Sequence, residues 1–261
     1  MSILDAIIQG VVQGLTEFLP VSSSGHLAIT QHILGAGTGE SNLFFNVMLH
    51  VGTLVAVVAF YHKLVWDLIK EFFLMLKDIF TGKFKWSKMN YNRNLVVMLI
   101  IGLIPLFLLF LPIPGTDMKL KDLADQLSAS PVLIVTACSL ILTSVLLTIG
   151  IIRNRKSVAS THKHLATKSN AKATRDNFNV VDAILVGVTQ VCAALLPGLS
   201  RSGSTLSVGE MRGISKQKAL DYTFVLGIPS ILAAALLEGV DAIKSPEGLS
   251  NIEFIPLIIG I

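Results

Sequence analysis

The sequence predicts an all-α integral membrane protein built from an inverted-topology repeat, with two re-entrant broken-helix pairs that meet near the bilayer midplane. Of its 261 residues, 52% are hydrophobic and 15% are charged, whereas a soluble domain carries about 25% charged residues. Several apolar runs approach the roughly 20 residues that cross a bilayer as a helix. Two further apolar helices are interrupted by stretches rich in proline and serine, and these two stretches resemble each other.

The first interrupted region, 2–34, reads as a re-entrant pair: a helix over 2–19, a loop over 21–25 and a short helix over 26–34. Pro20 ends the first helix because it removes a backbone donor and clashes with the preceding turn. Neither helix reaches the length of a full span. Irregular backbone at membrane depth is tolerated where it is buried or lines a cavity, so we expect the break to line one.

A polar stripe runs along the first of these helices, because Asp5, Gln9, Gln13 and Glu17 are spaced four residues apart. An amphipathic helix lying on the membrane surface is one interpretation, but no lysine or arginine flanks the opposite face to meet lipid head groups. Polar residues inside a membrane face the bundle interior or a wet cavity. We therefore expect the stripe to face inward.

Three apolar segments that could cross the membrane follow, at 44–61, 95–111 and 131–152. Basic residues are concentrated in the connectors 62–94 and 153–179, while the loop 112–130 is nearly neutral. The positive-inside rule makes the two basic connectors cytoplasmic and the neutral loop external. Topology thus accounts for the net charge of +4 without a nucleic-acid partner.

A second interrupted region, 180–212, repeats the order of helix, break and short helix, with Pro197 at its break. A span at 219–238 follows. The final apolar run, 252–261, is too short to cross a bilayer, so we expect the C-terminus to be truncated here. We divide this single membrane domain into repeat 1 over 2–152 and repeat 2 over 180–261.

The repeat is visible when the sequence is shifted by 177 positions, which aligns 4–23 with 181–200 at nine identities. The polar and conformationally special identities are Asp5/Asp182, Gly10/Gly187, Gln13/Gln190, Pro20/Pro197 and Ser23/Ser200. Three spans separate the two copies, so the second enters the membrane from the side opposite the first. In inverted repeats, interrupted helices mark the binding site near the midplane. The two breaks should therefore meet.

The chemistry available at the breaks suits a phosphate group. Each short helix begins with unpaired backbone N–H groups at the positive end of its dipole, and such helix ends bind phosphate. Arg201 adds a permanent cation whose planar fork matches phosphate oxygens, and its expected counter-ions are a substrate phosphate and Glu17. The neighbouring hydroxyl and glycine positions are Ser22, Ser23, Ser24, Gly25, Gly198, Ser200, Ser202, Gly203 and Ser204. Ordinary helix capping is the alternative role for these serines, and at least one must have it.

Glu17 and Gln13 lie one helical turn apart and could hold a divalent cation, with water and phosphate completing the oxygen shell. A protonated carboxyl in a helix contact is the alternative for Glu17. His26 could act as acid, base or nucleophile, or as a hydrogen-bonded structural histidine. Beside Glu17, Ser23 and Arg201 we favour catalysis. The remaining histidines have no such neighbours in the sequence: His32, His50, His62, His162 and His164.

This chemistry indicates a protein that binds a phosphorylated amphiphile and hydrolyses it. A transporter or lipid flippase is the main alternative, because inverted repeats with broken helices are transporter architecture. A lipid phosphatase of the acid-phosphatase type is another. It requires a second histidine after its Ser-Arg segment, and none follows Ser200-Arg201 through Lys218.

The motifs Gln13-x-x-x-Glu17, Pro20-Val-Ser-Ser-Ser-Gly-His26 and Pro197-Gly-x-Ser-Arg-Ser-Gly-x-Thr205 resemble the signatures of the bacterial undecaprenyl-diphosphate phosphatases, the bacitracin-resistance family. The resemblance covers the whole chain. It implies a membrane hydrolase that removes the terminal phosphate of undecaprenyl diphosphate, yields the monophosphate carrier for peptidoglycan synthesis and confers bacitracin resistance. Many members have glutamate where this chain has Gln13, which lowers the negative charge available to a metal.

The resemblance also implies the roles of the site residues. Glu17 and Gln13 would lie at Mg²⁺ or Ca²⁺ and the diphosphate, with Ser23 and His26 both candidates for the nucleophile or the general acid–base. Arg201 would clamp the diphosphate and also belongs to the catalytic set. The other residues expected to bind the diphosphate are Ser22, Ser24, Gly25, Ser200, Ser202, Gly203 and Thr205.

The implied location is the bacterial cytoplasmic (inner) membrane, with several passes and an active site open to the periplasmic side. The implied partners are the polyprenyl diphosphate substrate and membrane lipids, with no nucleic acid. Bacitracin would compete for the substrate rather than bind the protein. The chain could form a homodimer.

Overall fold

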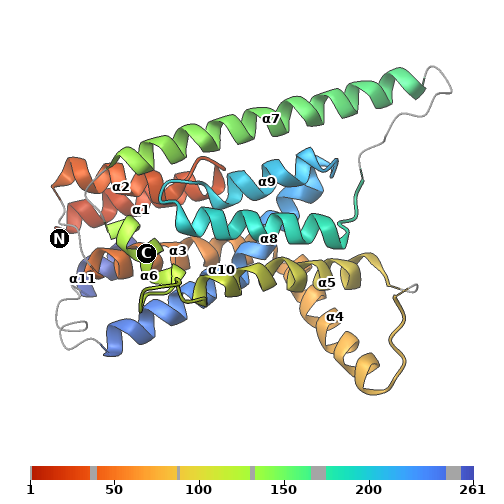
Figure 1. The fold of residues 1–261 in the computed structure, drawn as a ribbon, viewed down its shortest axis with the longest axis horizontal. Helices are drawn as coiled ribbons and strands as arrows, with labels where there is room; N and C mark the ends of the chain where they lie inside the picture. The colour runs from red at the N-terminus through yellow and green to blue at the C-terminus, as the bar shows by residue number, and fades with distance from the viewer. Residues whose placement is uncertain (1, 36–39, 87–88, 130–132, 166–174, 245–253) are drawn as a thin grey trace.

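The computed structural model describes residues 2–35, 40–86, 89–129, 133–165, 175–244 and 254–261 (Figure 1). These residues form helices without a named β-strand, and two isolated β-bridges join Pro112 to Lys119 and Arg175 to Ile214. The described helices are α1 (Ile3–Phe18), α2 (Ser23–Leu34), α3 (Glu40–Phe60), α4 (His62–Phe80), α5 (Tyr91–Leu103), the 3₁₀-helix η2 (Ile104–Phe110), α6 (Leu120–Ala129), α7 (Leu133–Leu165), α8 (Val180–Leu195), α9 (Arg201–Met211), α10 (Lys216–Lys244) and α11 (Phe254–Gly260). The all-α fold class is confirmed.

Three helical segments in the described part are long and apolar enough to cross a membrane: Tyr91–Phe110, Leu133–Arg155 and Lys216–Asp241. They correspond to the spans expected at 95–111, 131–152 and 219–238. The expected span at 44–61 is α3, and large apolar side chains on the outer faces of these helices are exposed, including Phe60, Phe107 and Ile134. An apolar exterior is what a lipid solvent requires. The chain is a multi-pass membrane protein.

The basic connector 62–94 was expected to be a loop, but its first 19 residues form the helix α4. This helix turns by 86° from α3 at Tyr61 and projects away from the bundle (Figure 1). Leu68 and Met75 are buried on the side that packs against the hydrophobic core near α5. One buried face is sufficient to stabilise an amphipathic helix. The many lysines of the connector make the regular spacing of its buried apolar residues hard to recognise in the sequence.

The two broken helix pairs share their local construction. α1 begins with a capping box between Ser2 and Asp5, and α8 begins with the same arrangement between Asn179 and Asp182. Reciprocal capping satisfies two backbone donors that a helix start otherwise leaves unpaired. The identity of Asp5 with Asp182 in the sequence repeat therefore has a structural reason. The inverted orientation of the two copies remains a prediction.

The short helices begin earlier than expected, because each is capped by a serine at its break. Ser22 Oγ accepts from Gly25 N at 3.2 Å and starts α2, and Ser200 Oγ accepts from Gly203 N at 2.9 Å and starts α9. Ser22 and Ser200 have the same capping role. The sequence alignment instead pairs Ser200 with Ser23, one position further along the chain. The second break holds one more residue between its proline and its cap. Ser23 is thereby placed in the first turn of α2.

The two breaks are in direct contact, as expected. A Cβ atom on Gly203 would lie 2.5 Å from the carbonyl oxygen of Pro20, and one on Gly25 would lie 3.1 Å from Gly198 Cα. Real Cβ atoms essentially never show the first distance, and the second is tighter than most Cβ contacts, so glycine allows the backbones to meet. The contact brings the start of each short helix against the break of the other pair.

Candidate active site

Glu17 lies at the centre of the contact, in the last turn of α1, with 9% of its side chain exposed. Its Oε1 accepts from Arg201 Nη2 at 3.3 Å, across the two breaks. Its Oε2 accepts from Ser23 Oγ at 2.6 Å and from Gln13 Nε2 at 3.3 Å. A buried carboxylate is costly unless it is paired and hydrogen-bonded. These three groups meet this need, so the expected pairing of Glu17 with Arg201 is confirmed.

From Gln9 to Glu17 the polar stripe of α1 faces the interior, as expected, whereas Asp5 is not buried and caps the start of the helix with Ser2. Gln9, Gln13 and Glu17 are all buried. The stripe continues into a network in which Gln31 Nε2 donates to Gln9 Oε1 and to Asn46 Oδ1, each at 2.7 Å. α1, α2 and α3 are therefore joined by side-chain amides, which hold the end of α1 in register with its neighbours.

Arg201 is the first residue of α9, and its guanidinium lies against α10. Nη1 donates to the carbonyl oxygen of Gly227 at 3.3 Å. A Cβ at Gly227 would lie 3.2 Å from Nη2, so glycine provides the space that the guanidinium occupies. With 27% of the side chain exposed, Arg201 retains N–H donors that a substrate oxyanion could use.

Ser23 is held between two groups that can take its proton. Its Oγ lies 2.6 Å from Glu17 Oε2 and 3.1 Å from His50 Nε2. His50 Nδ1 lies 2.7 Å from the carbonyl oxygen of Asn46, and a carbonyl only accepts, so Nδ1 carries the proton. The nitrogen that faces Ser23 is therefore the one that is basic in neutral imidazole. A hydroxyl, an oriented imidazole and a carboxylate within hydrogen-bond reach are the arrangement of an activated nucleophile.

His50 is the residue that the sequence analysis missed, and the expectation that it has no catalytic neighbours is wrong. It comes from α3, which lies outside both breaks. The sequence did contain a signal: Asn46, His50 and Thr53 are spaced by four and three residues and share one face of an otherwise apolar helix. Ionisable residues within membrane helices mark functional sites by default. Gln13 Nε2 lies 3.5 Å from Thr53 Oγ1, so that face meets the stripe of α1.

His26 lies in the first turn of α2, and its hydrogen bonds do not reach the other catalytic candidates. Its Nδ1 donates to the carbonyl oxygen of Ser22 at 2.7 Å. Among the described residues, no hydrogen bond joins it to Ser23, Glu17 or Arg201. The bond at Nδ1 fixes the ring and leaves Nε2 available to a ligand.

The residues expected to bind the diphosphate divide into two groups. Ser22 and Ser200 are buried helix caps, and Thr205 Oγ1 donates within α9 to the carbonyl oxygen of Arg201 at 2.8 Å. Gly25 and Gly203 permit the contact of the backbones. Ser22 has a φ of 76°, a left-handed conformation that costs a non-glycine residue about 1–3 kcal/mol and persists where the surroundings enforce it. The residues of this set that remain accessible to a ligand are Ser24, Arg201 and Ser202.

The donor set is compatible with a divalent cation if the substrate supplies part of the shell. Gln13 Oε1 is buried and has no hydrogen-bond partner within the described residues, and the adjacent Glu17 carboxylate adds further oxygen. The described chain offers no group of three or more histidine, cysteine, aspartate or glutamate side chains that could hold a metal by itself. Magnesium commonly takes one or two protein oxygens and completes its shell with water and phosphate. Gln13 and Glu17 fit that pattern.

Comparison with known proteins identifies relatives that match all or most of this chain. The family model of bacitracin resistance protein BacA matches residues 6–261. The undecaprenyl-diphosphatase of Bacteroides thetaiotaomicron is 34% identical over 261 residues, covering 100% of this chain and 84% of the relative. The undecaprenyl-diphosphatase of Alkaliphilus metalliredigens is 37% identical over 262 residues, covering 100% of this chain and 84% of the relative. The undecaprenyl-diphosphatase of Methanobrevibacter smithii is 36% identical over 241 residues, covering 91% of this chain and 76% of the relative.

Proposed function

The chain belongs to the bacitracin resistance protein BacA family, and we propose that the contact between its two broken helix pairs is where it hydrolyses undecaprenyl diphosphate. The products are undecaprenyl phosphate and inorganic phosphate, the reaction for which its relatives are named. Undecaprenyl phosphate is the lipid carrier for peptidoglycan synthesis. Its regeneration accounts for the bacitracin resistance after which the family is named.

One observation carries the assignment of the site: Ser23 Oγ lies within hydrogen-bond distance of both Glu17 Oε2 and His50 Nε2. A serine hydroxyl is a weak nucleophile until an adjacent base takes its proton. Arg201 lies 3.3 Å from Glu17 and neutralises that carboxylate, which makes Glu17 the weaker base. His50 has its Nδ1 proton fixed by Asn46 and presents Nε2. We assign the base to His50 and the orienting role to Glu17.

In the first step, Ser23 Oγ forms a bond to the terminal phosphorus while its proton passes to His50 Nε2. The bond from that phosphorus to the bridging oxygen breaks, and undecaprenyl phosphate leaves with its electron pair. The proton on His50 is released to the departing phosphate or to solvent. In the second step, water attacks the phosphoserine and gives its proton to His50. The phosphorus–Oγ bond then breaks, His50 returns the proton to Ser23, and inorganic phosphate is released.

Charge stabilisation at the phosphoryl group comes from the second break. Phosphoryl transfer depends chiefly on positioning and on neutralising the equatorial oxygens. Arg201 begins α9 and retains exposed donors, and the first N–H groups of α9 carry the positive end of its dipole. Removal of such a preorganised donor typically costs about 10²–10³ in kcat. His26 Nε2 and the accessible hydroxyls of Ser24 and Ser202 complete the set that can face the diphosphate.

A divalent cation, Mg²⁺ or Ca²⁺, would be held by Gln13 Oε1 and Glu17 with the diphosphate oxygens. When bound, it would neutralise phosphate charge and polarise the phosphoryl group. The chain's own contribution is to hold Gln13 buried next to Glu17, with Gln13 Oε1 left without a hydrogen-bond partner among the described residues.

We place the protein in the bacterial cytoplasmic membrane with the site open to the periplasmic side. The basic connectors support this orientation through the positive-inside rule. Bacitracin would then compete for the lipid diphosphate rather than bind the protein, and the chain could act as a homodimer. Cysteine labelling that placed 62–94 and 112–130 on one side of the membrane would contradict the orientation.

Phosphate release from a prenyl diphosphate by the purified protein in detergent separates this function from lipid transport. We expect sustained release of inorganic phosphate when Mg²⁺ or Ca²⁺ is present. A flippase would translocate the same lipid between leaflets of a proteoliposome without releasing phosphate. The absence of phosphate release by a folded protein would overturn the hydrolase assignment.

Changing His50 to glutamine is expected to lower kcat by about 10²-fold with little change in KM, because general-base catalysis contributes about 10²–10⁴-fold. Glutamine keeps a polar side chain against Ser23 but cannot take a proton. The matched control is His32→Gln, since His32 is an exposed histidine in the last turn of α2. Equal kcat values for His50→Gln and the parent protein would exclude His50 as the base.

Changing Gln13 to glutamate is expected to tighten the binding of the divalent cation, because a second carboxylate raises the negative charge of the site. The half-saturating Mg²⁺ concentration should fall by about tenfold, and Gln13→Leu should raise it. Isothermal titration of Mg²⁺ into the protein with a non-hydrolysable diphosphate lipid measures binding apart from turnover. A half-saturating concentration that is the same in all three proteins would contradict metal binding at Gln13.

A further inference from the structure

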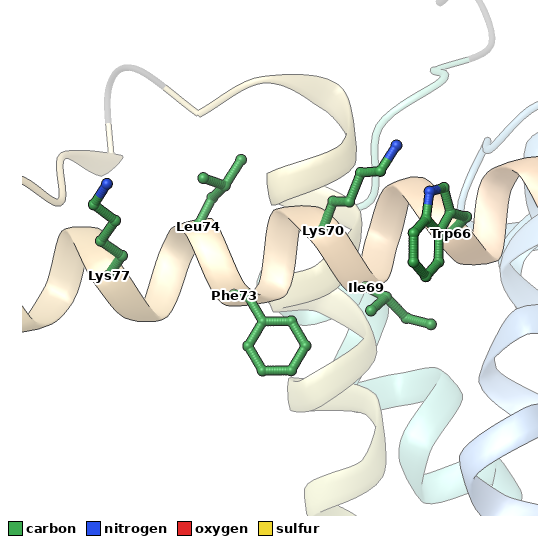
Figure 2. Close-up of a pocket in the computed structure, with 6 residues that line it drawn as sticks. All are labelled: Trp66, Ile69, Lys70, Phe73, Leu74 and Lys77. Carbon is green, nitrogen blue, oxygen red and sulfur yellow. The ribbon is translucent and has the colours of Figure 1, made fainter.

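Helix α4 has no part in the catalytic site, yet it carries an organised surface that nothing in the described structure covers. A pocket of about 660 Å³ on this helix is lined by Trp66, Ile69, Lys70, Phe73, Leu74 and Lys77 (Figure 2). Figure 2 shows Lys70 and Lys77 pointing the same way from the helix, with Ile69 and Phe73 turned away from them. The surface therefore has an apolar part and a basic part.

The residues of α4 are ordered in rows along the helix, because a spacing of seven is close to two helical turns. The first, the aromatic row, consists of Trp66, Phe73 and Phe80, which are 58%, 63% and 86% exposed. The second, the lysine row, consists of Lys63, Lys70 and Lys77, all exposed. Leu68 and Met75 form a buried row on the opposite side. The two exposed rows are adjacent, as shown by Lys70 Nζ, which lies 5.3 Å from the centre of the Trp66 ring.

The acidic residues of α4 are largely turned away from the lysine row. Glu71 Oε1 accepts from Arg93 Nε at 2.6 Å, and Asp78 Oδ2 accepts from Arg93 Nη1 at 2.8 Å. Arg93 belongs to α5, so both carboxylates face the bundle. Asp67 is the exception, with 53% of its side chain exposed and its Oδ1 3.9 Å from Lys70 Nζ. The exposed face of α4 keeps a net positive charge.

The position of α4 relative to the bundle places it at a membrane surface. α3 has 21 residues, which at 1.5 Å per residue corresponds to about 31 Å, close to the thickness of a bilayer core. At the end of that crossing the chain turns by 86° into α4. A helix perpendicular to a full span runs along the membrane plane. Tryptophan and lysine side by side are typical of helices at that depth, where the ring meets the acyl boundary and the ammonium reaches the head groups.

We propose that α4 lies in the plane of the membrane surface, with its aromatic row in the acyl-chain boundary and its lysine row bound to the head groups of anionic phospholipids. The lysine row offers three ammonium groups in line, and each lysine close to an anionic surface adds attraction to it. The acyl chains of neutral phospholipids could surround the aromatic row, but their head groups would not neutralise the lysine row. The proposal therefore requires selectivity for anionic lipid at this helix.

The test uses the full chain with Trp86→Phe, which leaves Trp66 as the single tryptophan of the two in the sequence. This protein is reconstituted in two nanodisc preparations of identical lipid composition, phosphatidylcholine with phosphatidylglycerol. In one preparation the phosphatidylglycerol carries brominated acyl chains, and in the other an equal amount of the phosphatidylcholine does. Bromine quenches tryptophan on contact, so the ratio of quenching reports which lipid surrounds Trp66. We expect brominated phosphatidylglycerol to quench Trp66 fluorescence at least about twofold more than brominated phosphatidylcholine does.

The lysine row is tested by charge reversal, with Lys63, Lys70 and Lys77 all changed to glutamate. Quenching by the two brominated lipids should then become equal, while the matched triple change to arginine keeps the preference because it keeps the charge. Phosphate release in detergent should persist in both triple variants, which shows that they fold. Equal quenching in the parent protein would overturn the proposal. So would an absence of quenching by either lipid, since the face would then be covered by something else, such as a second copy of the chain.

Discussion

Replacing Ser23 with alanine is expected to lower kcat for phosphate release by about 10³-fold or more, since loss of a nucleophile removes the chemical step itself. Ser23 Oγ is the one hydroxyl of the first break that contacts both Glu17 and His50. The protein should still fold, because the hydrogen bonds to Gln13 and Arg201 continue to satisfy Glu17. The measurement is single-turnover phosphate release, which separates chemistry from product release.

Ser24→Ala is the matched control for this change. Ser24 is the next residue in the same turn of α2 and is exposed. Its Oγ lies 3.4 Å from Ser22 Oγ. It can contact the substrate, but within the described part of the chain no hydrogen bond joins it to a base, so its loss should change kcat by less than about tenfold. A Ser24→Ala protein as impaired as Ser23→Ala, or a Ser23→Ala protein with ordinary kcat, would show that the nucleophile lies elsewhere, with His26 the next candidate.

Replacing Arg201 with alanine is expected to lower both activity and stability. kcat/KM should fall by about 10²–10³-fold, because the charge that neutralises the phosphoryl oxygens is lost. The free energy of unfolding should fall by about 3 kcal/mol, because Glu17 is left as a buried carboxylate without its cation. Glu17→Gln in the same chain removes that charge, so the double variant should be more stable than Arg201→Ala and remain inactive. Thermal unfolding in detergent and phosphate release together measure these effects.

Arg212→Ala is the control for a buried ion pair outside the site. Arg212 Nε donates to Asp182 Oδ1 at 2.8 Å near the start of α8, and Asp182 is completely buried. Its loss should lower stability and leave kcat/KM near that of the parent protein. Arg201→Lys tests the guanidinium itself, since lysine keeps the charge but lacks the bidentate fork. A fully active Arg201→Lys or Arg201→Ala protein would contradict the proposed role.

The contact between the two breaks could be predicted from the sequence because charged side chains inside a membrane have few places where they can be paired. A carboxylate and a guanidinium at breaks in apolar helices each need a partner, and neither Glu17 nor Arg201 has a counterpart in the other copy of the repeat. The prolines and serines that end and cap the helices act locally, so their effect is readable from short segments. The first turn of each short helix was misplaced by three or four residues, because a capping serine extends a helix back into a stretch that otherwise resembles a loop.

His50 could not be placed from the sequence because its role depends on packing. α3 has to lie against α1 and α2 before His50 Nε2 reaches Ser23, and no spacing along the chain specifies that contact. The polar face formed by Asn46, His50 and Thr53 indicated an inward-facing surface but not the group it would meet. The helix α4 could not be predicted from the sequence for another reason. Its lysines lower the mean hydropathy of the segment, and its 86° turn from α3 is a tertiary feature.

Rapid acid quenching of the protein during its first turnover, with a substrate labelled at the terminal phosphate, tests the central claim most directly. Peptide mapping then locates any label on the chain. If Ser23 attacks phosphorus with the help of Glu17 and His50, label should appear on the peptide that contains Ser23, as an acid-stable phosphoserine. It should be absent from Ser23→Ala. Label on His26 in a parallel alkaline quench, which preserves phosphohistidine, or an unlabelled protein while the first turnover is half complete, would contradict the account.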